Sequence, residues 1–165
     1  MVPFRQFINE IRLDQPHPYK WVKQTRTFWD GEFTTENGVK IEVEFSHYLS
    51  SENQAIWDFG FSYHTSELEA IRQKKGMVYF PTYGIGGTGD AIGVFATVVA
   101  MLRDFVKQHK NAVIEFEAKE PQRIKLYDIF LQRIREVLPG YVGKKLTGNA
   151  FSNNNGSYRI WPKYT

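Results

Sequence analysis

The sequence predicts a single domain of the α+β class. Between Thr25 and His64, apolar and polar residues alternate, which is the pattern of strands with one buried face. From Ala91 to His109, apolar residues instead recur at helical spacing, and a similar pattern begins at Pro121, so two helices are expected. With 165 residues, of which 42% are hydrophobic, the chain is long enough for one buried core and too short for two ordinary domains.

Residues 1–18 are predicted to form an N-terminal helix and a linker, and residues 19–165 the main domain. Residues 3–13 carry apolar side chains at helical spacing, and Pro16 and Pro18 then end the helix. The apolar face of this helix consists of Phe4, Phe7, Ile8 and Ile11.

Three strands are predicted between Thr25 and His64, joined as an antiparallel meander. A two-residue turn at Asn37-Gly38 would set apolar residues against charged ones, whereas a three-residue loop with Gly38 in a left-handed bulge collects one apolar face. We therefore predict the bulged turn. Its register pairs Phe33 with Ile41, Gly31 with Val43 and Trp29 with Phe45.

A glycine-rich segment separates the meander from the long helix pattern. Before it, residues 66–69 form a capping box that predicts a short helix, and the apolar run at residues 77–83 predicts a strand. The helix from Ala91 to His109 has apolar residues around most of its circumference. This pattern predicts a core helix packed on a sheet.

The C-terminal third is predicted to hold a strand, a helix and a hairpin. The strand spans residues 113–118, with Glu115 and Glu117 on its polar face. Pro121 is expected to occupy the first position of the helix, which continues to Leu138. The hairpin strands are predicted at Tyr141–Thr147 and Ser157–Trp161.

The segment from Tyr83 to Asp90 is the main candidate for a ligand site. Its glycines leave backbone N–H groups uncovered, and the helix start behind them carries a partial positive charge, so a phosphate would fit there. We reject a Walker loop, because Asp90 and Ala91 stand where Lys and Ser or Thr should follow. The remaining interpretations are a dinucleotide fingerprint at Gly84, Gly86 and Gly89, an acetyltransferase signature at Gly87 and Gly89, and a tight turn that binds nothing, since Asp90 would repel a pyrophosphate.

The composition argues against several kinds of site. The absence of cysteine excludes disulfides, zinc–thiolate sites and thiol nucleophiles. The 4 histidines share no metal-ligand spacing, so no metal is expected. The 21 basic and 18 acidic residues are interspersed and the net charge is only +3, so nucleic acid is not indicated. No apolar run approaches the ~20 residues of a membrane span, so no membrane association is expected.

The predicted order of elements and two motifs resemble the GNAT acyltransferase superfamily. The motifs are the glycine loop and the run Arg-Ile-Lys-Leu-Tyr at residues 123–127, followed by Gly140-Tyr141. The resemblance implies a GNAT-like fold, with a mixed, mostly antiparallel sheet flanked by helices. It also implies an N-acyltransferase that uses acetyl-CoA and an amine acceptor of unknown identity, with Tyr127 as the general acid that protonates the departing thiolate. The residues implied to bind the cofactor are Gly84, Gly87, Thr88, Gly89, Asp90 and Ala91.

The general base of such a reaction remains open at this point. Glu115 and Glu117 on the predicted central strand are two candidates, and Asp58 and His64 on the meander are two more. The sequence does not choose among them.

A second resemblance is to proteins encoded by large tailed bacteriophages. Residues 87–98 and 120–128 look like segments of such proteins, and residues 4–10 look like their leader sequences. This resemblance implies a phage-encoded acyltransferase in the cytoplasm of an infected bacterial host. The alternative is a non-catalytic protein that contacts other phage proteins or the host, either as a virion component or inside the host.

Overall fold

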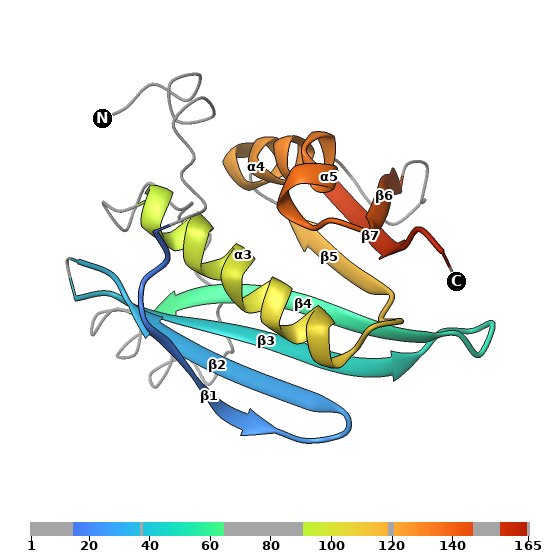
Figure 1. Cartoon of the computed structure of the whole chain (residues 1–165), viewed down its shortest axis with the longest axis horizontal. Coiled ribbons are helices and arrows are strands. Elements are labelled where there is room, and N and C mark those ends of the chain that lie inside the picture. The colour runs from blue at the N-terminus through green and yellow to red at the C-terminus, as the bar shows by residue number, and fades with distance from the viewer. Residues whose placement is uncertain (1–14, 37, 65–90, 119–120, 147–155, 165) are drawn as a thin grey trace, which may run out of the picture.

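The computed structural model describes residues 15–36, 38–64, 91–118, 121–146 and 156–164. Within these ranges, seven strands and three helices form a single α+β unit around one open sheet (Figure 1). The elements are β1 (Tyr19–Gln24), β2 (Phe28–Thr34), β3 (Lys40–Leu49), β4 (Ala55–His64), α3 (Ala91–Gln108), β5 (Ile114–Ala118), α4 (Pro121–Gln132), α5 (Ile134–Val137), β6 (Tyr141–Leu146) and β7 (Gly156–Pro162).

The strands lie in the order β1-β2-β3-β4-β5-β7-β6. Strands β4 and β5 are parallel, and the other neighbours are antiparallel. The sheet is therefore mixed and mostly antiparallel, as the GNAT resemblance implies. The final hairpin is confirmed as β6 and β7, and the central position predicted for the strand that carries Glu115 and Glu117 is confirmed as well.

The prediction of a three-strand meander is wrong. The meander has four strands, because β1 pairs with β2 ahead of the predicted three. The register of β1 against β2 shifts between Trp21 and Lys23, so Val22 lies in a bulge. Because of the bulge, the strand tolerates two adjacent apolar residues, Trp21 and Val22. The alternation of apolar and polar residues that would have identified a strand is therefore missing from the sequence.

The bulged turn at Gly38 is confirmed. Strand β2 pairs with β3 in the predicted register, with Trp29 opposite Phe45, Gly31 opposite Val43 and Phe33 opposite Ile41. Gly38 has a φ of 79°, in the left-handed region. Its N–H donates to the carbonyl of Thr35 at 3.0 Å, which closes the loop.

Replacing Gly38 by valine should lower the free energy of unfolding by about 1–2 kcal/mol, because a β-branched residue is strained at positive φ. No described atom lies within 4 Å of a Cβ built at this glycine, so the cost comes from the backbone alone. Urea unfolding measures the change. Gly38→Asn is the matched control with a smaller loss, since asparagine tolerates left-handed backbone. A valine variant as stable as the wild type would contradict this account of the turn.

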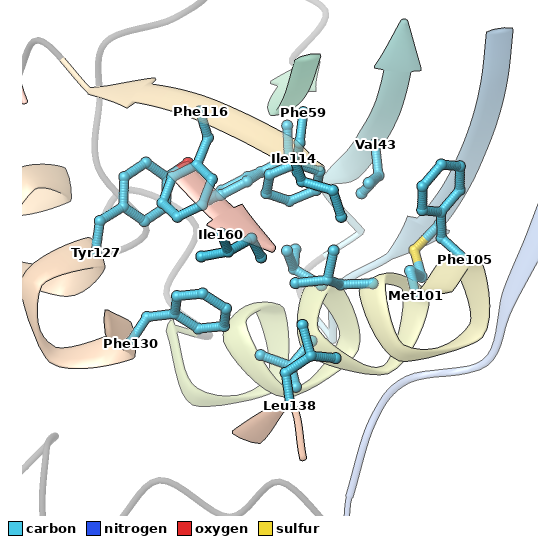
Figure 2. Close-up of a cluster of buried hydrophobic side chains, with 14 of the residues drawn as sticks. Val43, Phe59, Met101, Phe105, Ile114, Phe116, Tyr127, Phe130, Leu138 and Ile160 are labelled. Carbon is cyan, nitrogen blue, oxygen red and sulfur yellow. The ribbon is translucent and has the colours of Figure 1, made fainter. Parts of the chain in front are cut away.

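Helices α3, α4 and α5 cover one face of the sheet, here called the helix face (Figure 1). Inward side chains of β3, β4, β5 and β7 meet those of the helices in one core, as Figure 2 shows for part of it. Phe105 of α3 is fully buried and stacks on Phe45, with ring centroids 3.9 Å apart. The core helix predicted from Ala91 is confirmed, and it ends at Gln108.

The helix predicted from Pro121 to Leu138 is interrupted. Arg133 has a ψ of 17°, far from the helical value near −42°, and separates α4 from α5. The guanidinium of Arg103 on α3 binds the end of α5, with Nε donating to the Val137 carbonyl at 2.6 Å. This contact holds α5 against the core helix.

The opposite face of the sheet, here called the polar face, carries the alternate side chains of the same strands. It includes Glu42, Glu44, Asp58, Glu115 and Glu117. The residues predicted as an N-terminal helix (3–13), as a second short helix near 66–69, as a strand at 77–83 and as the glycine loop lie outside the described residues.

Candidate functional site

Strands β4 and β5 pair only over a short stretch and then part. Trp57 is opposite Ile114 and Asp58 is opposite Glu115, and beyond that point the described residues of the two strands are not paired with each other. Figure 1 shows β5 diverging from β4 beyond the paired end. We call this opening the β4–β5 wedge: residues 59–64 lie on one side and residues 116–118 on the other.

The edge of β4 faces the wedge. The N–H of Trp57 donates to the Val113 carbonyl at 2.8 Å, so it points toward β5. Backbone groups of a strand point to the same side at every second residue, so those of Phe59 and Phe61 also point toward β5. The carbonyl of Phe61 accepts a bond from Nη1 of Arg123 at 3.4 Å.

Arg123 is therefore bound at the edge of β4 and is not a fully solvated residue of the helix surface. Its side chain is half-buried, and its guanidinium carbon lies 4.6 Å from the centre of the Phe61 ring. Lys125, two residues later, is exposed. The first turn of α4 thus places one cation at the wedge.

Tyr127 lies at the wedge on the helix face. It is only 5% exposed, and its ring meets that of Phe116 edge to face with centroids 4.8 Å apart (Figure 2). A cavity of about 20 Å³ lies beside it, lined by Phe59, Phe61, Phe116, Leu126, Tyr127 and Phe130 together with four side chains of α3. A space of this size holds about one water-sized group.

Asp58 lies on the polar face, at the last paired position before the wedge. It alternates with the buried residues Trp57 and Phe59, so its carboxyl points away from the helices. Glu115 is its direct partner on β5, and Glu117 follows two residues later on the same face. Three carboxylates therefore meet where the strands part.

The pKa of Asp58 is raised to about 6. Partial burial of the carboxyl is the largest cause, followed by the negative charges of Glu117 and then Glu115. The side chain nevertheless keeps contact with solvent. An accessible carboxyl that titrates near neutral pH is suited to accept a proton from a substrate.

Glu115 is held by two other side chains. Its Oε1 accepts bonds from Nε and Nη2 of Arg159 at 2.7 and 2.5 Å, and its Oε2 accepts the hydroxyl of Tyr48 at 2.5 Å. Burial and Glu115 raise the pKa of the Tyr48 hydroxyl, so it remains a donor. Strands β3, β5 and β7 thus each contribute one member of a fixed cluster beside Asp58.

The structure brings together some of the predicted site residues. Asp58, Glu115 and Glu117 meet on the polar face, and Tyr127 lies on the helix face of the same wedge. Ala91 is the first residue of α3, and His64 is the last residue of β4. The predicted cofactor residues Gly84, Gly87, Thr88, Gly89 and Asp90 lie outside the described residues, and their role stays a prediction.

Tyr48 and Arg159 were not identified from the sequence. Glu115 and Arg159 are direct partners across the antiparallel β5–β7 pair. They are 44 positions apart in the chain, so only the strand order reveals the contact. No local motif surrounds either residue that could have indicated it.

The described part of the chain lacks two further kinds of feature. There, no group of three or more histidine, aspartate or glutamate side chains is arranged to hold a metal ion. Within the same ranges, no helix is both long and apolar enough to cross a membrane.

Comparison with known proteins gives one match. No curated protein and no solved structure shows significant similarity to the chain. Residues 18–142 match one protein family over a stretch that runs from the residue before β1 into the start of β6. Because this stretch is well over half of the 165 residues, the chain belongs to that family, the family of unknown function DUF6934.

Proposed function

We propose that the protein is an acyl-CoA-dependent N-acyltransferase whose active site is the β4–β5 wedge. The observation that carries the proposal is the placement of two groups on opposite faces of the sheet where the strands part. Asp58 lies on the polar face and Tyr127 on the helix face. Transfer of an acyl group from a thioester to an amine needs a proton acceptor for one partner and a proton donor for the other.

The wedge suits an extended chain that bears amide groups. The edge of β4 at Phe59 faces it, next to the Phe61 carbonyl that Arg123 binds, and an extended ligand can pair with such an edge through main-chain bonds. The pantetheine arm of CoA is a ligand of this kind. Ligands of parallel strands also tend to bind outside the carboxyl ends of the strands, where β4 and β5 separate.

The proton transfers assign a role to each residue. When the amine attacks the acyl carbon, a C–N bond forms and the C–S bond breaks. Asp58 takes the proton that the amine nitrogen gives up, and Tyr127 gives its hydroxyl proton to the sulfur that departs. The two protons exchange with solvent after turnover, so both residues return to their starting states.

The architecture supports the same proposal. The order of elements from β2 onward and the mixed, mostly antiparallel sheet fit the GNAT-like fold expected from the sequence. The helix that begins at Ala91 directly follows the predicted glycine loop. A helix start at this point provides the N–H groups and partial positive charge that favour a pyrophosphate.

Calorimetric titration of the full chain with acetyl-CoA tests the proposal. We expect a dissociation constant on the order of 10–100 μM, within the usual range for enzyme substrates. The control ligand is 3′-phospho-ADP, which carries the phosphates of CoA but lacks the pantetheine arm. It should bind at least about tenfold more weakly, because it makes no contact in the wedge.

Two results would count against the proposal. If acetyl-CoA produced no binding heat, the alternative of a non-catalytic interaction protein would be favoured. If acetyl-CoA and 3′-phospho-ADP bound equally well, a phosphate site would remain but the wedge would not be the pantetheine site.

A further inference from the structure

We propose that Arg159 and Tyr48 hold Glu115 as a fixed anion, so that Asp58 is the carboxyl of this cluster that accepts the proton of the incoming amine. Arg159 and Tyr48 are positioning residues in this proposal, because they act on Asp58 only through Glu115. The inference rests on the proposed function for its chemical meaning, but the location of the proton is measurable without any substrate.

Arg159 and Tyr48 both bind the carboxylate of Glu115. Both of its carboxylate oxygens accept short hydrogen bonds, one from a guanidinium and one from a phenol. Bonds donated to a carboxylate favour its charged form, and a neighbouring guanidinium favours it further. Protonation of Oε1 would set the new O–H against the guanidinium N–H groups, and protonation of Oε2 would force the Tyr48 hydroxyl to turn from donor to acceptor. Glu115 therefore keeps its negative charge.

The neighbours of Asp58 on β5 are acidic. From β5 it faces the charged side chains of Glu115 and Glu117, and from β3 the described titratable groups near it are Tyr48 and Glu44. Ser46 is its direct partner on β3 and carries no charge. Arg159 lies beyond Glu115 and binds that residue. Asp58 thus meets negative neighbours on β5, and burial adds to their effect, which is why its pKa is raised.

The two adjacent carboxylates therefore have different roles: Glu115 stays charged, and Asp58 accepts the proton. When two carboxyls interact strongly they titrate as a pair, and neither is then a well-defined base. Here the fixed charge of Glu115 removes that ambiguity. It keeps Glu115 from taking the proton and makes Asp58 a stronger proton acceptor than an ordinary aspartate.

Carboxyl carbon NMR of the full-length protein tests this directly, with pH titrations of wild type and Arg159→Gln. In the wild type, the Asp58 resonance should titrate near pH 6 while the Glu115 resonance stays constant over the same interval. In Arg159→Gln, the two resonances should move together, with part of the proton uptake transferred to Glu115. Tyr48→Phe should transfer a smaller share, because Glu115 then loses one neutral donor and keeps its cation.

Lys144→Gln is the matched control. Lys144 is the direct partner of Arg159 on β6, so its replacement also removes one positive charge from this end of the sheet. It should leave the proton on Asp58. Joint titration of Asp58 and Glu115 in the wild type would overturn the proposal. So would an unchanged division of the proton in both Arg159→Gln and Tyr48→Phe. If the former does not fold, Tyr48→Phe alone decides.

These titrations also separate the inference from the proposed function. If no acetyl-CoA binding is found while the proton moves as expected, the acyltransferase proposal fails and the electrostatic inference stands. If acetyl transfer is observed but the substitutions do not change how Asp58 and Glu115 share the proton, the acyltransferase proposal stands and the electrostatic inference fails. Where transfer occurs, the acidic limb of the pH–rate profile should broaden in Arg159→Gln and not in Lys144→Gln.

Discussion

Replacing Asp58 by asparagine is expected to lower acetyl transfer by about 100-fold or more, because the amide has the same shape but cannot accept the proton of the amine. The wild-type rate should rise with pH through about 6, as Asp58 loses its proton. This limb should be absent in the variant. Initial rates with acetyl-CoA and a panel of amines between pH 5 and 8 measure both effects.

Glu42→Gln is the control for this experiment. Glu42 lies on the same polar face, opposite Ser62 on β4, and the substitution removes one negative charge there while Asp58 and its strand partners Ser46 and Glu115 are kept. Its rate and pH profile should match the wild type. If Asp58→Asn retains the wild-type rate, Asp58 is not the base.

The same substitution should have the opposite effect on stability. The pKa of Asp58 is raised in the folded protein from 3.8 to about 6, so the folded state holds this proton more tightly than the unfolded chain. Stability therefore falls as pH rises from about 4 to 6, and the loss persists at neutral pH. Asp58→Asn should thus be more stable than wild type at pH 7, by less than about 1 kcal/mol since the side chain is solvent-exposed, and equally stable below about pH 4.

If Asp58→Asn loses activity and gains stability, the two results together indicate that Asp58 serves function and not the fold. A residue that only supports the fold would not destabilise it at working pH. A charged group retained at such a position is typical of functional sites, where local stability and activity conflict. Thermal unfolding of the two proteins at pH 4 and pH 7 provides the comparison.

The register of the β2–β3 hairpin could be predicted because two local signals agree. Gly38 is the residue type best suited to a left-handed backbone, and the shifted register would set Val43 against Glu32 and Phe45 against Asp30. The core helix was equally clear, since it is apolar around most of its circumference. Both elements depend on residues that are close in the chain.

The wedge could not be predicted because it depends on the order of strands. Hydrophobic periodicity shows which residues of β4 and β5 are buried, but not that these strands are neighbours, nor that their pairing stops after Asp58 and Glu115. The sequence therefore supplied Asp58, Glu115 and Tyr127 as separate candidates. Only the three-dimensional arrangement places the first two together and the third behind them.

Replacing Tyr127 by phenylalanine is the second critical test, and we expect it to lower turnover by at least about tenfold while the fold and the affinity for CoA are kept. The ring is buried and packs against Phe116, Phe61 and Tyr158, and phenylalanine preserves these contacts. Only the hydroxyl is lost. In a purely structural role, its loss would cost roughly 1 kcal/mol of stability or less.

Tyr141→Phe is the matched control, because it removes the hydroxyl of an equally buried tyrosine. Tyr141 is 6% exposed, compared with 5% for Tyr127, and its hydroxyl donates to the Ala112 carbonyl at 3.1 Å. This variant should lose about 1 kcal/mol of stability and no turnover. Tyr127→Phe should therefore lower the turnover rate, whereas Tyr141→Phe should lower only the free energy of unfolding. If both leave the rate unchanged, Tyr127 serves packing alone, and the wedge lacks the proton donor that the acyltransferase proposal requires.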